Sequence, residues 1–131
     1  MITNQPRRVL IVDDDESAGL AAQLGIALAT DWEARVVTSG DEALERCRIW
    51  QPGAVLLDTE MPDRDGFATL AALRREPSIR HIPVVLVADP ATSNAAIAAL
   101  APTLAGVLDK PLDMSSVGPR LTHLLDWPAY N

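Results

Sequence analysis

Four short runs of apolar residues, none of which alternates with polar ones, constrain the fold of this chain more than any other feature. They lie at residues 9–12, 54–57, 84–87 and 104–108. A run of this kind is typical of a strand that is covered on both faces, as the strands of parallel sheets are. Segments with helical patterns separate the runs. The sequence therefore predicts a parallel sheet with helices on both sides.

A fifth, weaker strand is expected at Ala34–Thr38. Leu20, Leu24 and Leu28 recur at four-residue spacing, which predicts an amphipathic helix whose apolar side they mark. The helices are expected from Glu16 to about Ala29, Ser39 to Trp50, Gly66 to Arg75, Ala91 to Leu100 and Val117 to Leu125. Strand and helix alternate five times. The predicted fold is a three-layer, doubly wound (βα)5 α/β domain with the flavodoxin-like strand order 2-1-3-4-5.

The inward residues of the later helices follow from the same spacing. The expected ones are Ala43, Leu44, Cys47, Trp50, Phe67, Leu70, Ala71, Val117, Leu121, Leu124 and Leu125. Ser39 is the expected N-cap of the second helix. The tail from Trp127 to Asn131 is expected to be loosely held, and the three tryptophans are not expected to stack on one another.

Length and charge bound the remaining possibilities. The 131 residues fit one domain, 1–131, with a core from about 8 to 126. A net charge of −7 argues against direct nucleic-acid binding. One cysteine excludes a disulfide framework, and no signal-peptide core or membrane-length apolar run is visible, so a cytoplasmic protein is expected.

Charged residues follow three of the apolar runs. Asp13 and Asp14 follow the first, Asp58 follows the second, and Lys110 comes shortly after the last. The carboxyl ends of parallel strands share one sheet edge, so these side chains should converge there. Three carboxylates in one crevice favour a divalent ion such as Mg²⁺, and Lys110 adds a point charge. Such a set suits phosphoryl transfer onto a carboxylate, although Asp58 alone is equally explained as a cap or turn residue.

From Val9 to about Leu125 the sequence resembles the receiver domains of two-component response regulators. The parts that carry the resemblance are, in order, Asp13-Asp14, Asp58, Met61-Pro62, Asp65-Gly66 and Lys110-Pro111. Each part is weak by itself, but together in this order they are highly specific.

The resemblance implies a role for each of these residues. Asp58 would accept the phosphoryl group, and Lys110 would contact it. Asp14 and Asp58 would bind Mg²⁺ through their side chains, Glu60 through its backbone carbonyl, and Asp13 through water. The peptide bond before Pro111 is usually cis in this family.

Two positions depart from the family pattern. The family normally has Ser or Thr where this chain has Ala88, and often Tyr or Phe where it has Val107. Ala88 lacks the hydroxyl that would bond the phosphoryl group, and Val107 lacks the ring that would reorient. The expected acceptor chemistry is intact, whereas the usual conformational relay is missing.

Three functions remain open at this stage. The first is a phosphoacceptor that is served by a histidine kinase or a histidine phosphotransfer protein docking near Ser17, Ala18 and Pro111, with a downstream protein or a second copy as a further partner. The second is a degenerate receiver that binds partners without phosphorylation. The third is a haloacid-dehalogenase-type phosphatase, because residues 13–17 resemble its nucleophile motif. That class usually needs a larger chain and a cap domain, so we do not expect this protein to be an enzyme.

Overall fold

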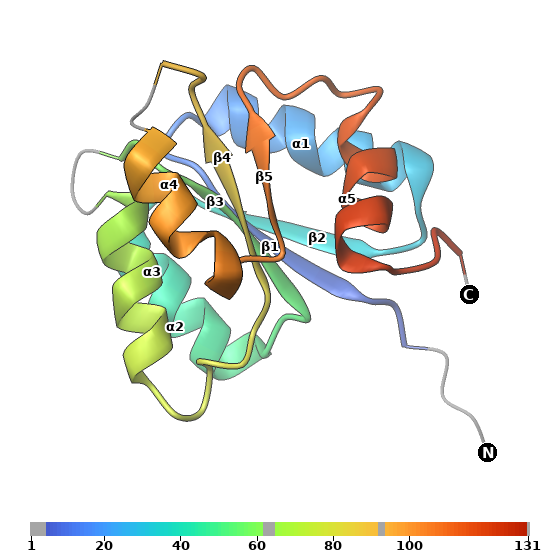
Figure 1. Ribbon diagram of the computed structural model, residues 1–131. Helices are drawn as coiled ribbons and strands as arrows, with labels where there is room; N and C mark the ends of the chain where they lie inside the picture. The colour runs from blue at the N-terminus through green and yellow to red at the C-terminus, as the bar shows by residue number, and fades with distance from the viewer. Residues whose placement is uncertain (1–4, 62–64, 92–93, 131) are drawn as a thin grey trace.

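Five parallel strands form one sheet in the order β2-β1-β3-β4-β5 (Figure 1) in the computed structural model, which describes residues 5–61, 65–91 and 94–130. The strands are β1 (Arg8–Val12), β2 (Glu33–Val37), β3 (Ala54–Asp58), β4 (Val84–Ala88) and β5 (Gly106–Asp109). The parallel pairing and the strand order confirm the fold predicted from the sequence. β3 and β4 are buried along their whole length, as their unbroken apolar runs predict.

Helices cover both faces of this sheet (Figure 1). The helices are α1 (Glu16–Ala29), α2 (Gly40–Trp50), α3 (Gly66–Arg75), α4 (Asn94–Leu100) and α5 (Val117–Leu125), with a 3₁₀ turn over Ala101–Thr103. α1 and α5 contact each other on one face, and α2 and α3 contact each other on the opposite face. Two apolar clusters, one on each side of the sheet, form the core.

Side-chain caps fix where three of the helices begin. Ser39 accepts a hydrogen bond from the Glu42 N–H, so its predicted role as the N-cap of α2 is confirmed. Asp15 and Asp65 cap α1 and α3 in the same way. Because both carboxylates lie at the carboxyl edge of the sheet, they also shape the loops that surround the strand tips.

The predicted orientation of α1 is wrong. Leu20, Leu24 and Leu28 are 53%, 46% and 73% exposed. The helix instead buries Gly19, Ala22, Gly25 and Ile26. A Cβ on Gly25 would lie 2.5 Å from the Met114 carbonyl oxygen, and one on Gly19 would lie 2.7 Å from a Val36 methyl group. Close backbone approach through these glycines therefore decides which side of α1 faces the sheet.

Other differences are smaller. β2 starts one residue before the prediction, β5 is confined to Gly106–Asp109, and α4 starts at Asn94. Residues 92 and 93, on which the earlier predicted start of α4 depends, lie outside the described residues. Ala71 is exposed, and α3 buries Thr69 and Leu73 beside Leu70 instead. The other predicted inward positions of α2, α3 and α5 are buried or half-buried.

The C-terminal tail is held against the start of β2, contrary to the prediction. The Asp31 N–H donates to the Ala129 carbonyl at 2.8 Å, and the Trp32 indole N–H donates to the Pro128 carbonyl at 2.9 Å. The rings of Trp32 and Trp127 meet edge to face with centroids 5.1 Å apart. No helix among the described residues is long and apolar enough to span a bilayer.

Candidate functional site

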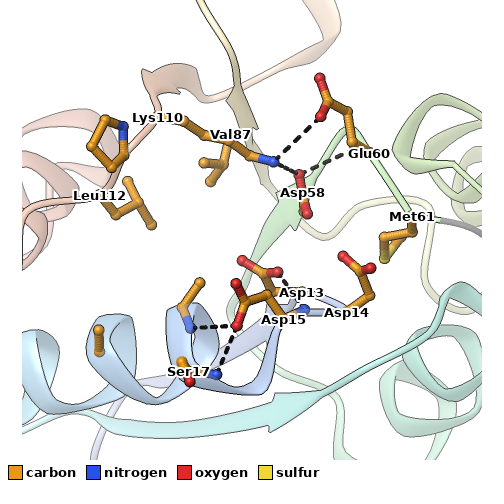
Figure 2. Close-up of a pocket in the computed structure, with 13 residues that line it drawn as sticks. Asp13, Asp14, Asp15, Ser17, Asp58, Glu60, Met61, Val87, Lys110 and Leu112 are labelled. Atoms are coloured by element: carbon orange, nitrogen blue, oxygen red, sulfur yellow. Dashed lines mark hydrogen bonds and ion pairs between the residues drawn. The ribbon is translucent and has the colours of Figure 1, made fainter.

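The carboxyl tips of β1 and β3 bring three aspartates together. Asp13 and Asp14 follow β1, and Asp58 is the last residue of β3. One carboxylate oxygen from each of the three lies within 4.8 Å of the others. Figure 2 shows these carboxylates facing a common space above the start of α1. The convergence that the strand pattern predicts is therefore present.

Lys110 reaches this group from the tip of β5. Its Nζ lies 2.6 Å from Asp58 Oδ1 and 4.0 Å from Glu60 Oε2 (Figure 2). The Asp58 side chain is only 3% exposed, whereas that of Lys110 is 28% exposed. Burial lowers the pKa of Lys110, but the hydrogen bond and charge of Asp58, with the charges of Glu60 and Asp13, raise it above its ordinary value. Lys110 is therefore a fixed cation at the site.

Asp13 is buried at the tip of β1, and this burial disfavours the charged form of its carboxyl group. Burial raises its pKa from 3.8 to about 6, although a hydrogen bond from the Asp15 N–H lowers it. The charge of Asp58 raises the pKa further, and the charge of Lys110 opposes that effect. An additional cation in the crevice would stabilise the charged form of this buried carboxyl group.

The loop after β3 fixes the Asp58 carboxylate through its own backbone. The Glu60 N–H donates to Asp58 Oδ1 at 3.1 Å, and the Gly66 N–H donates to the Thr59 carbonyl at 3.1 Å. A Cβ on Gly66 would lie 2.1 Å from the Asp58 carbonyl oxygen. Gly66 is the first residue of α3, as the sequence predicts, and it is also a point of close backbone approach.

A cavity of about 880 Å³ contains the whole group. It is lined by Asp13, Asp14, Asp15, Ser17, Ala18, Ala21, Asp58, Glu60, Met61, Val87, Lys110, Pro111 and Leu112. The Lys110–Pro111 peptide bond is cis, as the resemblance implies. Pro62 lies outside the described residues. The predicted docking positions Ser17, Ala18 and Pro111 are therefore at the rim of the same cavity as Asp58.

Two apolar lining residues, Val87 and Leu112, are not singled out by the sequence pattern. Each is the chain neighbour of a residue that is, so adjacency to Ala88 or Pro111 is the available signal. Their side chains, with that of Met61, give the acidic group an apolar wall. Such a wall lowers the local dielectric constant and strengthens the interactions among the charges.

The two atypical positions lie in the strands beside the site. Ala88 is 2% exposed at the end of β4, and its carbonyl accepts a hydrogen bond from the Lys110 N–H at 2.9 Å. Val107 is half-buried and packs against the cluster under α2 and α3. A nearby hydroxyl, that of Thr59, donates to the Val87 carbonyl at 3.2 Å.

The donor set fits a hard divalent cation. Carboxylate oxygens are the protein ligands that Mg²⁺ prefers, and it usually takes one or two of them together with waters. Three such oxygens come within 4.8 Å of one another here. The residues present therefore fit the Mg²⁺ ion that the sequence predicts.

A doubly wound α/β domain binds its ligands in the crevice at the carboxyl ends of its strands, which is where the three aspartates and Lys110 lie. The family model of the response regulator receiver domain matches residues 9–121. The chain belongs to this family. Receiver domains act in two-component systems as phosphoacceptors, and they bind Mg²⁺ at an acidic pocket.

Individual relatives agree with this assignment. The chain is 31% identical to protein Rrf1 of Nitratidesulfovibrio vulgaris over 109 residues, which cover 82% of this chain and 75% of Rrf1. It is 33% identical to response regulator PleD of Caulobacter vibrioides over 106 residues, which cover 81% of this chain but only 23% of PleD. A CheY-like receiver domain structure from Methylobacillus flagellatus has a TM-score of 0.76 at 25% identity, covering 92% of this chain and 99% of the other.

Proposed function

We propose that this chain accepts a phosphoryl group on Asp58 from the phosphohistidine of a histidine kinase or a histidine phosphotransfer protein. The observation that carries the proposal is the position of the Asp58 carboxylate, which is 3% exposed, contacts Lys110 and lies within 4.8 Å of two further carboxylates. Such a carboxylate is held in place and has its charge balanced for in-line attack.

The proposed step forms a bond between an Asp58 oxygen and phosphorus and breaks the bond from phosphorus to the donor. Lys110 would contact the transferred oxygens with its ammonium group. The Glu60 N–H, which already donates to Asp58 Oδ1 at 3.1 Å, orients the carboxylate. The reaction is a transfer onto the chain itself, so we do not propose turnover of an external substrate.

The proposed metal ligands are those that the resemblance implies. Asp14 and Asp58 would bind Mg²⁺ through their carboxylates, Glu60 through its backbone carbonyl, and Asp13 through water. The bound ion would neutralise charge on the phosphoryl oxygens. The charged form of Asp13, whose pKa is raised to about 6 by burial, would be stabilised by this ion.

The absence of the usual relay suggests how the signal is read. With Ala88 and Val107 in place, neither a mobile hydroxyl nor a ring is available at these two positions. We therefore propose that phosphorylation changes partner affinity at the cavity itself, around Ser17, Ala18 and Pro111. The same two residues favour the alternative function, a degenerate receiver that binds partners without phosphorylation.

The deciding experiment is intact-mass measurement after incubation with Mg²⁺ and a small-molecule phosphodonor such as acetyl phosphate. We expect one added phosphoryl group on the wild type and none on Asp58→Ala. Asp89→Ala removes an exposed carboxylate beyond the tip of β4, outside the cavity lining, and serves as the matched control that should still be labelled. An unlabelled wild type, under conditions that label another receiver domain, would favour the degenerate receiver.

A further inference from the structure

The side chain of Glu60 is a charged group of the cavity to which the proposed phosphorylation chemistry gives no role. The described residues that line the cavity include five carboxylates, those of Asp13, Asp14, Asp15, Asp58 and Glu60. Asp13, Asp14 and Asp58 converge within 4.8 Å of one another, and Asp15 caps α1 by accepting hydrogen bonds from two N–H groups of the helix. The carboxylate of Glu60 belongs to neither set.

Glu60 lies on the solvent side of the acceptor. The side chain of Asp58 is 3% exposed, that of Lys110 is 28% exposed, and that of Glu60 is 60% exposed. Lys110 connects the three charges, because its Nζ lies 2.6 Å from Asp58 Oδ1 and 4.0 Å from Glu60 Oε2 (Figure 2). Exposure therefore increases in steps from the acceptor to the mouth of the cavity, and Glu60 lies at the mouth.

The leaving group of a phosphodonor faces this mouth. In-line transfer places the leaving atom on the opposite side of phosphorus from the attacking oxygen of Asp58. Because the Asp58 carboxylate is buried at the tip of β3, a donor reaches it from the solvent side, and its leaving group points outward. The charge of Glu60 therefore acts on the leaving group as well as on Lys110.

A carboxylate at the mouth affects two classes of donor differently. In phosphoramidate and in protonated phosphohistidine, the nitrogen bonded to phosphorus belongs to a positively charged group. Its P–N bond breaks with the electron pair on nitrogen, which leaves as a neutral amine or imidazole. An acyl phosphate instead breaks a P–O bond and releases a carboxylate anion. The negative charge of Glu60 attracts the partly positive nitrogen group in the transition state and repels the developing carboxylate.

We propose that Glu60 is a specificity-determining residue for the phosphodonor, and that it favours a cationic nitrogen leaving group over an anionic one. This inference rests on the proposed phosphorylation of Asp58 and names the donor class that the site prefers. A protein-borne phosphohistidine belongs to that class. One unit of charge at roughly 5–6 Å from Glu60 in a solvated mouth changes the preference by about three- to tenfold.

The test is the ratio of second-order rate constants for labelling by phosphoramidate and by acetyl phosphate, measured by intact mass with Mg²⁺ present. We expect Glu60→Gln to lower this ratio about three- to tenfold, and Glu60→Lys to lower it again by a similar factor, because each step changes the charge by one unit. Glu60→Asp keeps the charge and should keep most of the ratio. All three variants retain the N–H of residue 60 that donates to Asp58 Oδ1.

The matched control is Glu45→Gln, at an exposed position on α2 that is not among the residues lining the cavity. It removes the same charge from the chain and should leave the ratio as it is in the wild type. Higher salt should move the wild-type ratio toward that of Glu60→Gln, since added ions screen the charge at the mouth. Circular dichroism verifies that each variant is folded.

Two outcomes would overturn the inference while the phosphorylation of Asp58 stands. The first is labelling by both donors at a ratio that Glu60→Gln leaves unchanged. The second is an equal fall of the ratio in Glu60→Gln and Glu45→Gln. A wild type that neither donor labels would instead refute the proposed phosphorylation, and the inference would fall with it.

Discussion

Lys110 Nζ lies 2.6 Å from Asp58 Oδ1, so the cation at the tip of β5 contacts the carboxylate at the tip of β3 directly. The two residues come from strands that are separated in the sheet by β4. A divalent ion at the three aspartates would share the Asp58 carboxylate with this ammonium group. Lys110 and the ion would therefore compete electrostatically for the acidic cluster, while both would favour the proposed transfer to Asp58.

Lys110→Met separates these two effects. Because the variant removes a positive charge beside the aspartates, we expect its affinity for Mg²⁺ to rise on the order of tenfold. Its rate of phosphorylation should fall, since no ammonium contacts the incoming group. Isothermal titration calorimetry measures the first quantity and intact-mass kinetics the second. Arg120→Met, at an exposed position on α5, is the control and should change neither.

Asp13→Asn should stabilise the protein near neutral pH. The pKa of Asp13 is raised from 3.8 to about 6 by burial, so the folded state binds a proton that the unfolded state has released between these values. The free energy of unfolding therefore falls as pH rises from 3.8 to about 6, by on the order of 3 kcal/mol in total. Relative to the wild type, the free energy of unfolding of Asp13→Asn should be higher by that amount at pH 7–8 and nearly unchanged at pH 3.

Urea denaturation at these pH values measures the effect. Asparagine keeps an oxygen that accepts the hydrogen bond from the Asp15 N–H, so this hydrogen bond is preserved. The matched change Asp14→Asn, at an exposed carboxylate, should give a smaller gain. An equal gain for both variants at pH 7–8 would contradict the burial argument.

Gly66→Ala should destabilise the domain. An added Cβ would lie 2.1 Å from the Asp58 carbonyl oxygen and 2.6 Å from the Thr59 Cα, and backbone atoms have little freedom to yield. We expect a loss of about 2–4 kcal/mol in thermal or urea unfolding. Ala71→Ser, at an exposed position of the same helix, should cost less than about 1 kcal/mol. A Gly66→Ala variant as stable as the wild type would show that α3 shifts freely.

Much of the fold could be predicted because unbroken apolar runs identify buried parallel strands. The orientation of α1 could not, because four-residue periodicity shows that a helix has an apolar side without showing which side meets the sheet. The close contacts of Gly19 and Gly25 decide that question, and they depend on atoms from distant segments. The strand tips likewise predicted that the aspartates and Lys110 converge, whereas the close approach of Gly66 to Asp58 required the structure.

The tail was predicted to be loose because its composition gives no sign of the partner that holds it. The edge of the Trp127 ring lies 2.9 Å from where a Cβ on Gly53 would be, and the Arg7 Cζ lies over the same ring, 5.0 Å from its centroid. Trp127→Ala removes these contacts and the edge-to-face pair with Trp32. We expect about 2–4 kcal/mol of lost stability by urea denaturation. Tyr130→Ala, at a residue 62% exposed, is the control and should change little.

Ala88→Thr tests whether the missing hydroxyl matters to the proposed phosphoryl adduct. Val87 pairs with Asp58 in the sheet register, so position 88 lies one residue beyond the acceptor on the neighbouring strand. A hydroxyl that donates to the anionic phosphoryl oxygens should lengthen the adduct's lifetime by about tenfold, as expected of one hydrogen bond to a charged group. The natural comparison is Ala88→Val, which has the same shape without the donor. Because position 88 is only 2% exposed, both changes strain the strand tip similarly, and the difference between them isolates the hydrogen bond. Mass spectrometry after the donor is removed measures the lifetime of the adduct in each variant. Equal lifetimes would show that the receiver does not use a hydroxyl at this position.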